Sequence, residues 1–223
     1  MPDEKSLVLW VDTALLVVNK PAGLPTLPDG YDKTAPHLIS ILKPHFGRLW
    51  IVHRLDKNTS GVLALARTAE AHRSLNTQFD ERQVSKVYHA LVEGSPGWEE
   101  QTVNLSLRKD GDRMHRTILD SVSGKWAVTH VRVLRRLAGY TLLEARPETG
   151  RTHQIRVHLA ALGFPLAGDW LYGSKAPFPA QAEQPVELLG LHAWSLALQH
   201  PTTQEKLTFQ APYPEYWKSV FPT

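Results

Sequence analysis

The sequence predicts an α+β fold in which a few helices flank a mixed, largely antiparallel β-sheet. Apolar, β-branched runs typical of strands outnumber the helical segments along the 223 residues. Strands and helices do not alternate in the rhythm of βαβ units, which argues against a parallel sheet. Apolar residues make up 42% and charged residues 21% of the chain, ordinary values for a protein with a buried core.

The first half of the chain predicts three strands, two helices and a long loop. Residues 14–18 form a short apolar run, predicted to be a strand that ends before Pro21. Residues 21–36 are rich in Pro, Gly and Asp and predict a loop, followed by a short helix over 37–42. Residues 49–53 and 61–67 predict buried strands on either side of a charged segment. Thr68 is a good N-cap for a helix that places Leu75 and Phe79 on one face.

The second half predicts mainly strands. Alternating side chains over 85–93 predict a strand, and residues 128–134 and 140–145 predict a hairpin. Thr152 is the expected N-cap of a helix that runs to Leu162 and stops at Gly163. The polar, proline-rich residues 174–185 predict a surface loop, and 189–198 and 206–209 predict the last strands.

Composition excludes several classes of chemistry. The chain has no cysteine, so disulfides, thiol nucleophiles and cysteine-bound zinc are excluded, and a reducing cytosol fits. The N-terminus lacks the basic region of a signal peptide. The apolar stretch over 7–18 is far shorter than the roughly 20 residues of a membrane span. We therefore expect a soluble, cytoplasmic protein with no membrane partner.

Charge is concentrated in three basic clusters, at residues 108–116, 131–136 and 151–158. The net charge is only +3, so these clusters fit either a polyanionic partner or ordinary solvated surface. Motifs for nucleotide binding, for zinc proteases and for a serine nucleophile elbow are not found. The histidines are scattered without metal-ligand spacing, so we expect no metal site.

The first candidate for chemistry is Asp56, in the segment VHRLDKNTSG between two predicted strands. Loops held by a rigid sheet commonly carry catalytic groups, and the neighbouring Arg54 and Lys57 would keep a carboxylate ionised for attack or proton removal. The alternative is a plain turn, because Asp56, Asn58 and Gly61 are all good turn formers.

Two further candidates lie in the basic second half. Tyr88, in Lys86-Val87-Tyr88, can offer a ring face to a base and a hydroxyl to a proton, or it can simply pack in the core. Arg156 is expected near the N-terminus of the second long helix, where a cation is mildly unfavourable. A buried carboxylate such as Asp56 would compensate, unless Arg156 is exposed. Arg151 and the Thr152 hydroxyl at the same helix terminus would suit a phosphate.

Taken together, these stretches resemble a known family. HRLDKNTSG, SKVYHALVEG and ETGRTHQIRVHLAALGFPLAGDWLYG resemble, in that order, the signature blocks of the RluA-type pseudouridine synthases. VVNKPAGLPT is similar to the opening block of that family, and LHAWSLALQHPTTQEKLTFQAPYP is similar to its closing block. The five blocks cover nearly the whole chain.

The resemblance implies the pseudouridine synthase fold and the isomerisation of uridine to pseudouridine in ribosomal or transfer RNA, without cofactor or metal. It implies that Asp56 is the catalytic carboxylate and that Tyr88 stacks beneath the uracil. It also implies that Arg156 pairs with Asp56 and that Arg54 fills the space of the flipped base. The remaining residues expected to bind RNA are Lys86, Arg151, Thr152 and His153.

The resemblance also sets expectations for domain organisation. Residues 1–223 are expected to form a single catalytic domain, without the N-terminal S4 domain of many relatives, and to act as a monomer. Target choice would then come from residues 108–116 and 174–185. Two other functions stay open: a non-catalytic RNA-binding module, and a hydrolase of nucleosides or glycosides. A hydrolase usually needs a second carboxylate, for which Glu148 is the available residue.

Overall fold

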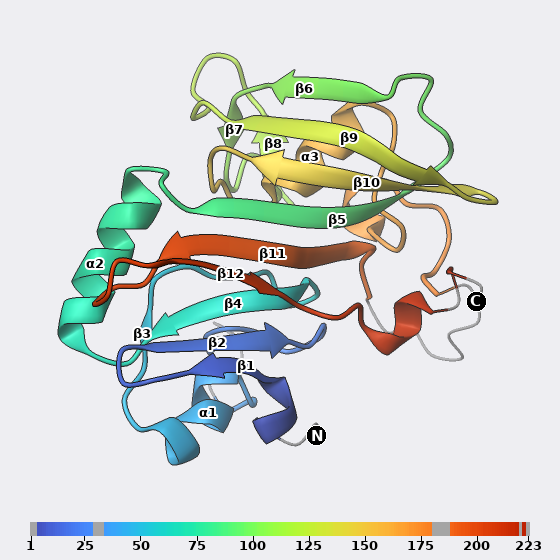
Figure 1. Ribbon diagram of the computed structural model, residues 1–223. Helices are drawn as coiled ribbons and strands as arrows, with labels where there is room; N and C mark the ends of the chain where they lie inside the picture. Colours follow the sequence, from blue (N-terminus) through green and yellow to red (C-terminus); the bar gives the residue numbers. More distant parts are fainter. Residues whose placement is uncertain (1–3, 29–33, 180–187, 219, 222–223) are drawn as a thin grey trace. The chain divides into compact units, whose positions relative to one another are not determined.

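The computed structural model of the protein describes residues 4–28, 34–179, 188–218 and 220–221. The chain forms two compact units. The first comprises Met1–Lys86 and Ala193–Glu215, and the second comprises Val87–His192 and Tyr216–Thr223. Among the described residues antiparallel strands outnumber helices, so the α+β fold class is confirmed (Figure 1).

The first unit is built on a sheet whose strands follow the order β1–β2–β4–β11. β3 pairs with β4 and β12 with β11, and every pair of known register is antiparallel. The elements that belong to this unit wholly or in large part are η1 Glu4–Leu7, β1 Val8–Val11, β2 Leu15–Lys20, α1 Leu38–Phe46, β3 Trp50–Ile51, β4 Ser60–Ala66, α2 Ala69–Asp80, β11 Leu191–Gln199 and β12 Lys206–Gln210.

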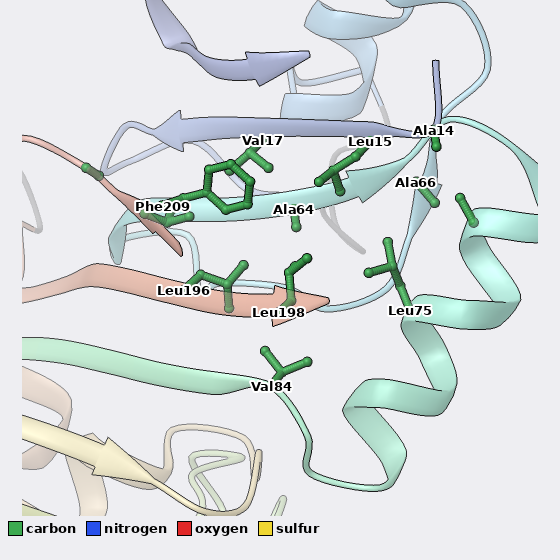
Figure 2. Close-up of a cluster of buried hydrophobic side chains, with 13 residues drawn as sticks. Ala14, Leu15, Val17, Ala64, Ala66, Leu75, Val84, Leu196, Leu198 and Phe209 are labelled. Carbon is green, nitrogen blue, oxygen red and sulfur yellow. The ribbon is translucent and has the colours of Figure 1, made fainter. Parts of the chain in front are cut away.

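The core of the first unit gathers apolar side chains from its sheet and from α2. Figure 2 shows Leu15 of β2, Ala64 of β4, Leu75 of α2, Leu196 of β11 and Phe209 of β12 in one cluster. Burial of this apolar surface drives the packing. All seven residues of β4 are buried, which makes this strand the firm element to which the charged loop before it is attached.

The second unit contains strands in the order β5–β10–β9–β6, again paired antiparallel. The predicted hairpin is confirmed, with Leu137 N donating to Tyr140 O at its turn, 2.8 Å away. Helix α3 packs on one face of this sheet through Ile155 and Leu159, against Leu143 and other apolar residues. The bounds are β5 Ser85–Glu93, β6 Glu100–Asn104, β9 Val128–Arg136, β10 Tyr140–Pro147, α3 Gln154–Ala161, η2 Trp170–Tyr172 and η3 Glu215–Trp217.

A small separate hairpin carries the basic residues 108–116. Its strands, β7 (Leu107–Arg108) and β8 (Ile118–Leu119), form a two-stranded sheet of their own. The loop between them is held by Asp112, whose carboxylate accepts from the backbone N–H groups of Met114 and Arg116 and from Arg116 Nε at 2.6 Å. This segment therefore forms a two-stranded sheet outside the larger one.

Some element boundaries differ from the predicted ones. They are determined by capping side chains or by the path of the chain, and not by apolar periodicity. Helix α1 begins after His37, which forms a reciprocal capping box with Ser40, and it continues four residues beyond the predicted end at Leu42. Strand β3 covers only Trp50–Ile51 of the predicted 49–53, because the chain leaves the sheet at Val52 to enter the charged loop.

The predicted surface loop over 174–185 is only partly described. Ser174 and Phe178 are buried, which corrects the expectation of a wholly exposed segment. Residues 180–185 lie outside the described residues. In the portion of the chain that the structure describes, no helix combines the length and apolar character needed to cross a membrane.

Candidate functional site

Asp56 lies in the loop between β3 and β4 of the first unit, half-buried between exposed Arg54 and Lys57. The backbone carbonyl of Asp56 accepts from Thr59 N at 3.1 Å, so the loop does contain the turn that the sequence suggested. That turn closes at Thr59. Ser60 and Gly61 already belong to β4, which begins one residue before the predicted strand over 61–67.

The loop is pinned by Lys20, a residue that sequence analysis missed. Lys20 is completely buried at the end of β2, and its Nζ donates to three backbone carbonyls. These are Pro21 O at 2.8 Å, Leu24 O at 2.7 Å and Lys57 O at 3.0 Å. Burial lowers the pKa of Lys20 to about 7, while the charge of Asp56 acts in the opposite direction. A positive or half-titrated amine thus stands close to Asp56 at neutral pH.

Two more contacts fix the same loop. Thr26 Oγ1 donates to Leu55 O at 3.1 Å, and both residues are buried. His53 Nε2 accepts from Ala64 N at 2.9 Å, and the His53 ring stacks on Phe79 with centroids 4.7 Å apart. Burial, aided by the charge of Lys86, lowers the pKa of His53 to about 3. His53 is therefore neutral and serves as a structural acceptor.

Close backbone approach makes Gly61 necessary at the start of β4. Its φ is +112°, and a Cβ added there would lie 2.2 Å from the carbonyl oxygen of Ala193 on β11. No side chain fits this position. The end of the Asp56 loop is thus anchored to β4 with the neighbouring strand packed directly against it.

Tyr88 and Lys86 lie on β5, one on each side of the point where the chain passes from the first unit to the second. Tyr88 is half-buried and packs against the core of the second unit, which fits in part the alternative of a core aromatic. Lys86 is also half-buried. Burial, together with the positive charge of Arg82, lowers the pKa of Lys86 to about 8.

The expected cap of α3 is wrong. His153, in the left-handed conformation with φ 54°, is the N-cap, and it makes no side-chain capping bond. Gln154 takes over instead: its Oε1 accepts from Arg151 N at 3.0 Å and from Thr149 Oγ1 at 2.6 Å. A side chain inside the helix thus closes the turn that Thr152 was expected to close. Gly163 stops the helix with φ +86°, as predicted.

Gln154 begins a buried polar chain that ties α3 to the sheet. Its Nε2 donates to Val128 O at 2.8 Å and to Thr129 Oγ1 at 2.9 Å. Thr129 Oγ1 also lies 3.0 Å from His158 Nδ1, and His158 Nε2 lies 3.0 Å from Leu105 O. Such fully satisfied buried networks rigidify their surroundings, so α3 is held firmly over β9.

Arg156 projects from α3 onto a short segment that carries Asp169 and Tyr172. Its Nε and Nη2 donate to the two oxygens of Asp169 at 2.7 and 2.8 Å, and its Cζ lies 5.0 Å from the Tyr172 ring centroid. Arg156 is therefore buried, and not the exposed residue of the alternative. Its pairing with Asp56 stays a prediction, because Asp56 belongs to the other compact unit.

Tyr172 also joins this group to the small hairpin. Its hydroxyl oxygen accepts from Thr117 N at 3.1 Å and lies 2.9 Å from His153 Nδ1. Burial raises the pKa of the Tyr172 hydroxyl despite the nearby charge of Arg156, so the hydroxyl is protonated at neutral pH. Asp169 and Tyr172 lay within the quoted motif block, but no local pattern marked them.

The predicted basic clusters are largely neutralised by local ion pairs. Arg108 pairs with Asp120 at 2.5 Å and Arg136 with Glu99 at 2.8 Å. Exposed Arg113 and Arg135 form no ion pair with any described residue. Arg151 is half-buried and its Nε donates to Trp126 O. The positive surface is therefore weaker than the sequence suggests.

Glu148, the carboxylate named for a hydrolase, is exposed and pairs with His130 at 2.7 Å. Nearby, an open polar groove of about 440 Å³ crosses β6, β9 and β10. Arg132 and Arg146 of this groove both pair with Glu144, so it is not a simple anion track. Among the described residues, no three or more His, Asp or Glu side chains are placed together to hold a metal ion.

The sequence profile of a family described as RNA pseudouridylate synthase matches residues 14–161 of this chain. The match covers more than half of the chain. It includes the charged loop before β4 and the buried Arg156 on α3. The chain belongs to the RNA pseudouridylate synthase family, and the predicted resemblance is confirmed.

Individual pseudouridine synthases are also similar in sequence to this chain. A ribosomal large subunit pseudouridine synthase D of Nitrosomonas europaea is 41% identical over 225 residues, which covers 93% of this chain and 62% of the relative. An uncharacterized RNA pseudouridine synthase of Zymomonas mobilis is 39% identical and covers 96% of this chain and 97% of its own length. The chain thus spans about three-fifths of the length of the Nitrosomonas and Neisseria meningitidis relatives.

A solved structure of similar fold is the human RNA pseudouridylate synthase domain containing 4. It has a TM-score of 0.76 at 28% sequence identity, and the match covers 98% of this chain and 94% of the human chain. The human RNA pseudouridylate synthase domain containing 1 matches with a TM-score of 0.74 at 29% identity. The fold of nearly the whole chain therefore has solved counterparts in the same family.

Proposed function

We propose that this protein is an RNA pseudouridine synthase that converts one or more uridines to pseudouridine in ribosomal or transfer RNA. The observation that carries the proposal is the family match over residues 14–161, which includes Asp56, Tyr88 and Arg156. The names of several relatives, which refer to the ribosomal large subunit, make large-subunit ribosomal RNA the first substrate to test.

The reaction breaks the C1′–N1 glycosidic bond and forms a C1′–C5 bond, and the proton displaced from C5 is balanced by one gained at N1. In the proposed mechanism Asp56 supplies the carboxylate, either by attack on C1′ or by removal of the 2′ proton. The contacts of Lys20, Thr26 and His53 support this role, because a catalytic group must be held within a fraction of an ångström of its working position.

The other proposed site residues assist base flipping and binding. Tyr88 stacks on the uracil and takes part in proton transfer at C5, and Arg54 occupies the space that the flipped base leaves. Arg156 pairs with Asp56 and holds its carboxylate through charge-assisted hydrogen bonds. Contacts to the RNA backbone come from Lys86, Arg151, Thr152 and His153. They contribute affinity more than sequence choice.

The proposal includes the broader organisation of the protein. We propose that residues 1–223 act as one catalytic domain, as a monomer in the cytoplasm and without cofactor or metal. Residues 108–116 and 174–185 would select the target RNA. Exposed Met114 and Arg113 in the first of these segments support contact with bases and phosphates.

Tritium release from RNA labelled at C5 of uracil tests the proposal. Wild-type protein is expected to release tritium from large-subunit ribosomal RNA, and Asp56→Ala is expected to release none above background. Asp80→Ala, which removes an exposed carboxylate at the end of α2, is the control and should retain activity. Absence of release from all ribosomal and transfer RNA would contradict the proposal. RNA binding without release would favour a binding module, and free uracil would favour a hydrolase.

A further inference from the structure

Asp169 anchors the Arg156 guanidinium through two hydrogen bonds. The Asp169 side chain is 1% exposed and the Arg156 side chain 10%, and two charge-assisted hydrogen bonds of 2.7 and 2.8 Å join them. This two-bond geometry fixes the plane of the guanidinium and its rotation within that plane. The Tyr172 ring, 5.0 Å from Cζ, lies against the guanidinium face.

Asp169 is itself rigidly held. Its carbonyl accepts from Tyr172 N and Ser174 N, both at 3.0 Å, and its N–H donates to Leu166 O. The preceding Gly168 has φ +76°, and a Cβ there would lie 2.3 Å from Leu188 O. These contacts fix the backbone conformation around Asp169. The same short segment places both the Asp169 carboxylate and the Tyr172 ring against Arg156.

Stability alone does not account for this arrangement. A buried Arg–Asp pair must offset the desolvation of two charges, and well-packed apolar residues of similar size are often at least as stable. What the buried pair adds is a fixed orientation of the Arg156 guanidinium. Arginine has five N–H donors in a rigid fork, of which Asp169 takes two, so the orientation of the other three is set by Asp169.

We propose that Asp169 is a positioning residue for the reaction: it holds the Arg156 guanidinium so that its remaining N–H donors meet the acceptor they serve during turnover. The inference rests on the proposed function, in which that acceptor is Asp56. Asp169 acts through Arg156 and does not touch the RNA. Tyr172 supports the same guanidinium from its face.

The test is a double-mutant cycle on the full-length protein with C5-tritiated large-subunit ribosomal RNA. Asp169→Asn keeps the size of the side chain but removes its charge and one of the two acceptors. It is expected to lower kcat about 10- to 100-fold while the Kd for RNA stays within about threefold, as for a group that acts on positioning. Arg156→Met should show the same division between kcat and Kd.

The double variant decides between positioning and general damage. If Asp169 acts through Arg156, Asp169→Asn has no further effect in the Arg156→Met background. Losses that multiply, or wild-type kcat in Asp169→Asn alone, would overturn the inference. Absence of tritium release by the wild-type protein would instead refute the proposed function, so the two failures are distinguishable.

Two further variants guard the interpretation. Asp12→Asn replaces a carboxylate that accepts hydrogen bonds from Ala14 N and Leu15 N, far from the proposed chemistry in sequence. It should lower stability without changing kcat. If Asp169→Asn fails to fold, Tyr172→Leu removes the ring beneath Arg156 and leaves Asp169 in place. Its kcat should fall with little change in Kd, and wild-type kcat in this variant would count against the proposal.

Discussion

Lys20 shows how much of a site can depend on one residue without an obvious signal. The sequence VVNKPAG places it at the end of a strand, where an exposed lysine would be the ordinary expectation. In the structure it is buried and holds three carbonyls, one of them in the Asp56 loop. Local pattern cannot reveal this, because the acceptor Lys57 is 37 residues away in sequence.

The lowered pKa of Lys20 predicts a pH-dependent contribution to stability. The unfolded chain keeps this proton up to about pH 10.5, whereas the folded protein loses it near pH 7. Between these values the unfolded state binds more protons, so stability rises with pH. We expect the free energy of unfolding of the wild type, minus that of Lys20→Met, to increase by about 1 kcal/mol per pH unit from roughly pH 7 to 10.

Urea unfolding of both proteins across this pH range measures the difference. Lys43→Met, which removes an exposed lysine from α1, serves as the control and should follow the wild type throughout. A difference that stays flat across the range would show that the folded Lys20 keeps its proton.

Helix termini illustrate which elements the sequence predicts well. Thr68 was predicted to cap α2, and its Oγ1 accepts from Ala71 N at 3.1 Å. Thr152 was predicted to cap α3 on the same reasoning and does not. The two threonines look alike locally. The difference arises because Gln154 and Thr149 form a competing network with β9, which only the tertiary structure provides.

The contrast between Thr68 and Thr152 predicts different losses of stability when each hydroxyl is removed. Thr68→Ala should lower the free energy of unfolding by about 1 kcal/mol, because an Ala71 N–H loses its acceptor. Thr152→Ala should cost less than about 0.5 kcal/mol, as is usual for positions away from such features. Thr77→Ala, inside α2, controls for the change of residue type. Urea unfolding at one pH compares the three, and equal losses at Thr68 and Thr152 would restore the original cap assignment.

For the chain in its entirety, the sequence predicted the fold class, most strands and the family. These follow from apolar periodicity and from motif blocks, which are properties of short segments. The division into two compact units and the Arg156–Asp169 pair were not predicted. Both depend on partner choice among distant residues, and many carboxylates in the chain could have paired with Arg156.

Local ion pairing across the molecule predicts how RNA affinity responds to salt. An arginine that already pairs with a carboxylate releases fewer counterions from RNA than an unpaired one. Arg113→Gln should therefore reduce the slope of log affinity against log salt by about one, and Arg108→Gln, whose arginine pairs with Asp120, by distinctly less. Fluorescence anisotropy with a labelled RNA fragment, between about 50 and 200 mM salt, measures the slopes. Equal changes for the two variants would show that the Arg108–Asp120 pair opens on binding.

The first unit is built from two separate segments of the chain, and this affects how it folds during synthesis. Its core needs Leu196 and Phe209, and Gly61 fits against Ala193, yet the whole of Val87–His192 is synthesised between these partners. On the ribosome the contiguous second segment emerges before the first unit can close. Until then the apolar faces of β2 and β4 are incompletely covered. Nascent chains with exposed apolar surface of this kind depend on chaperones.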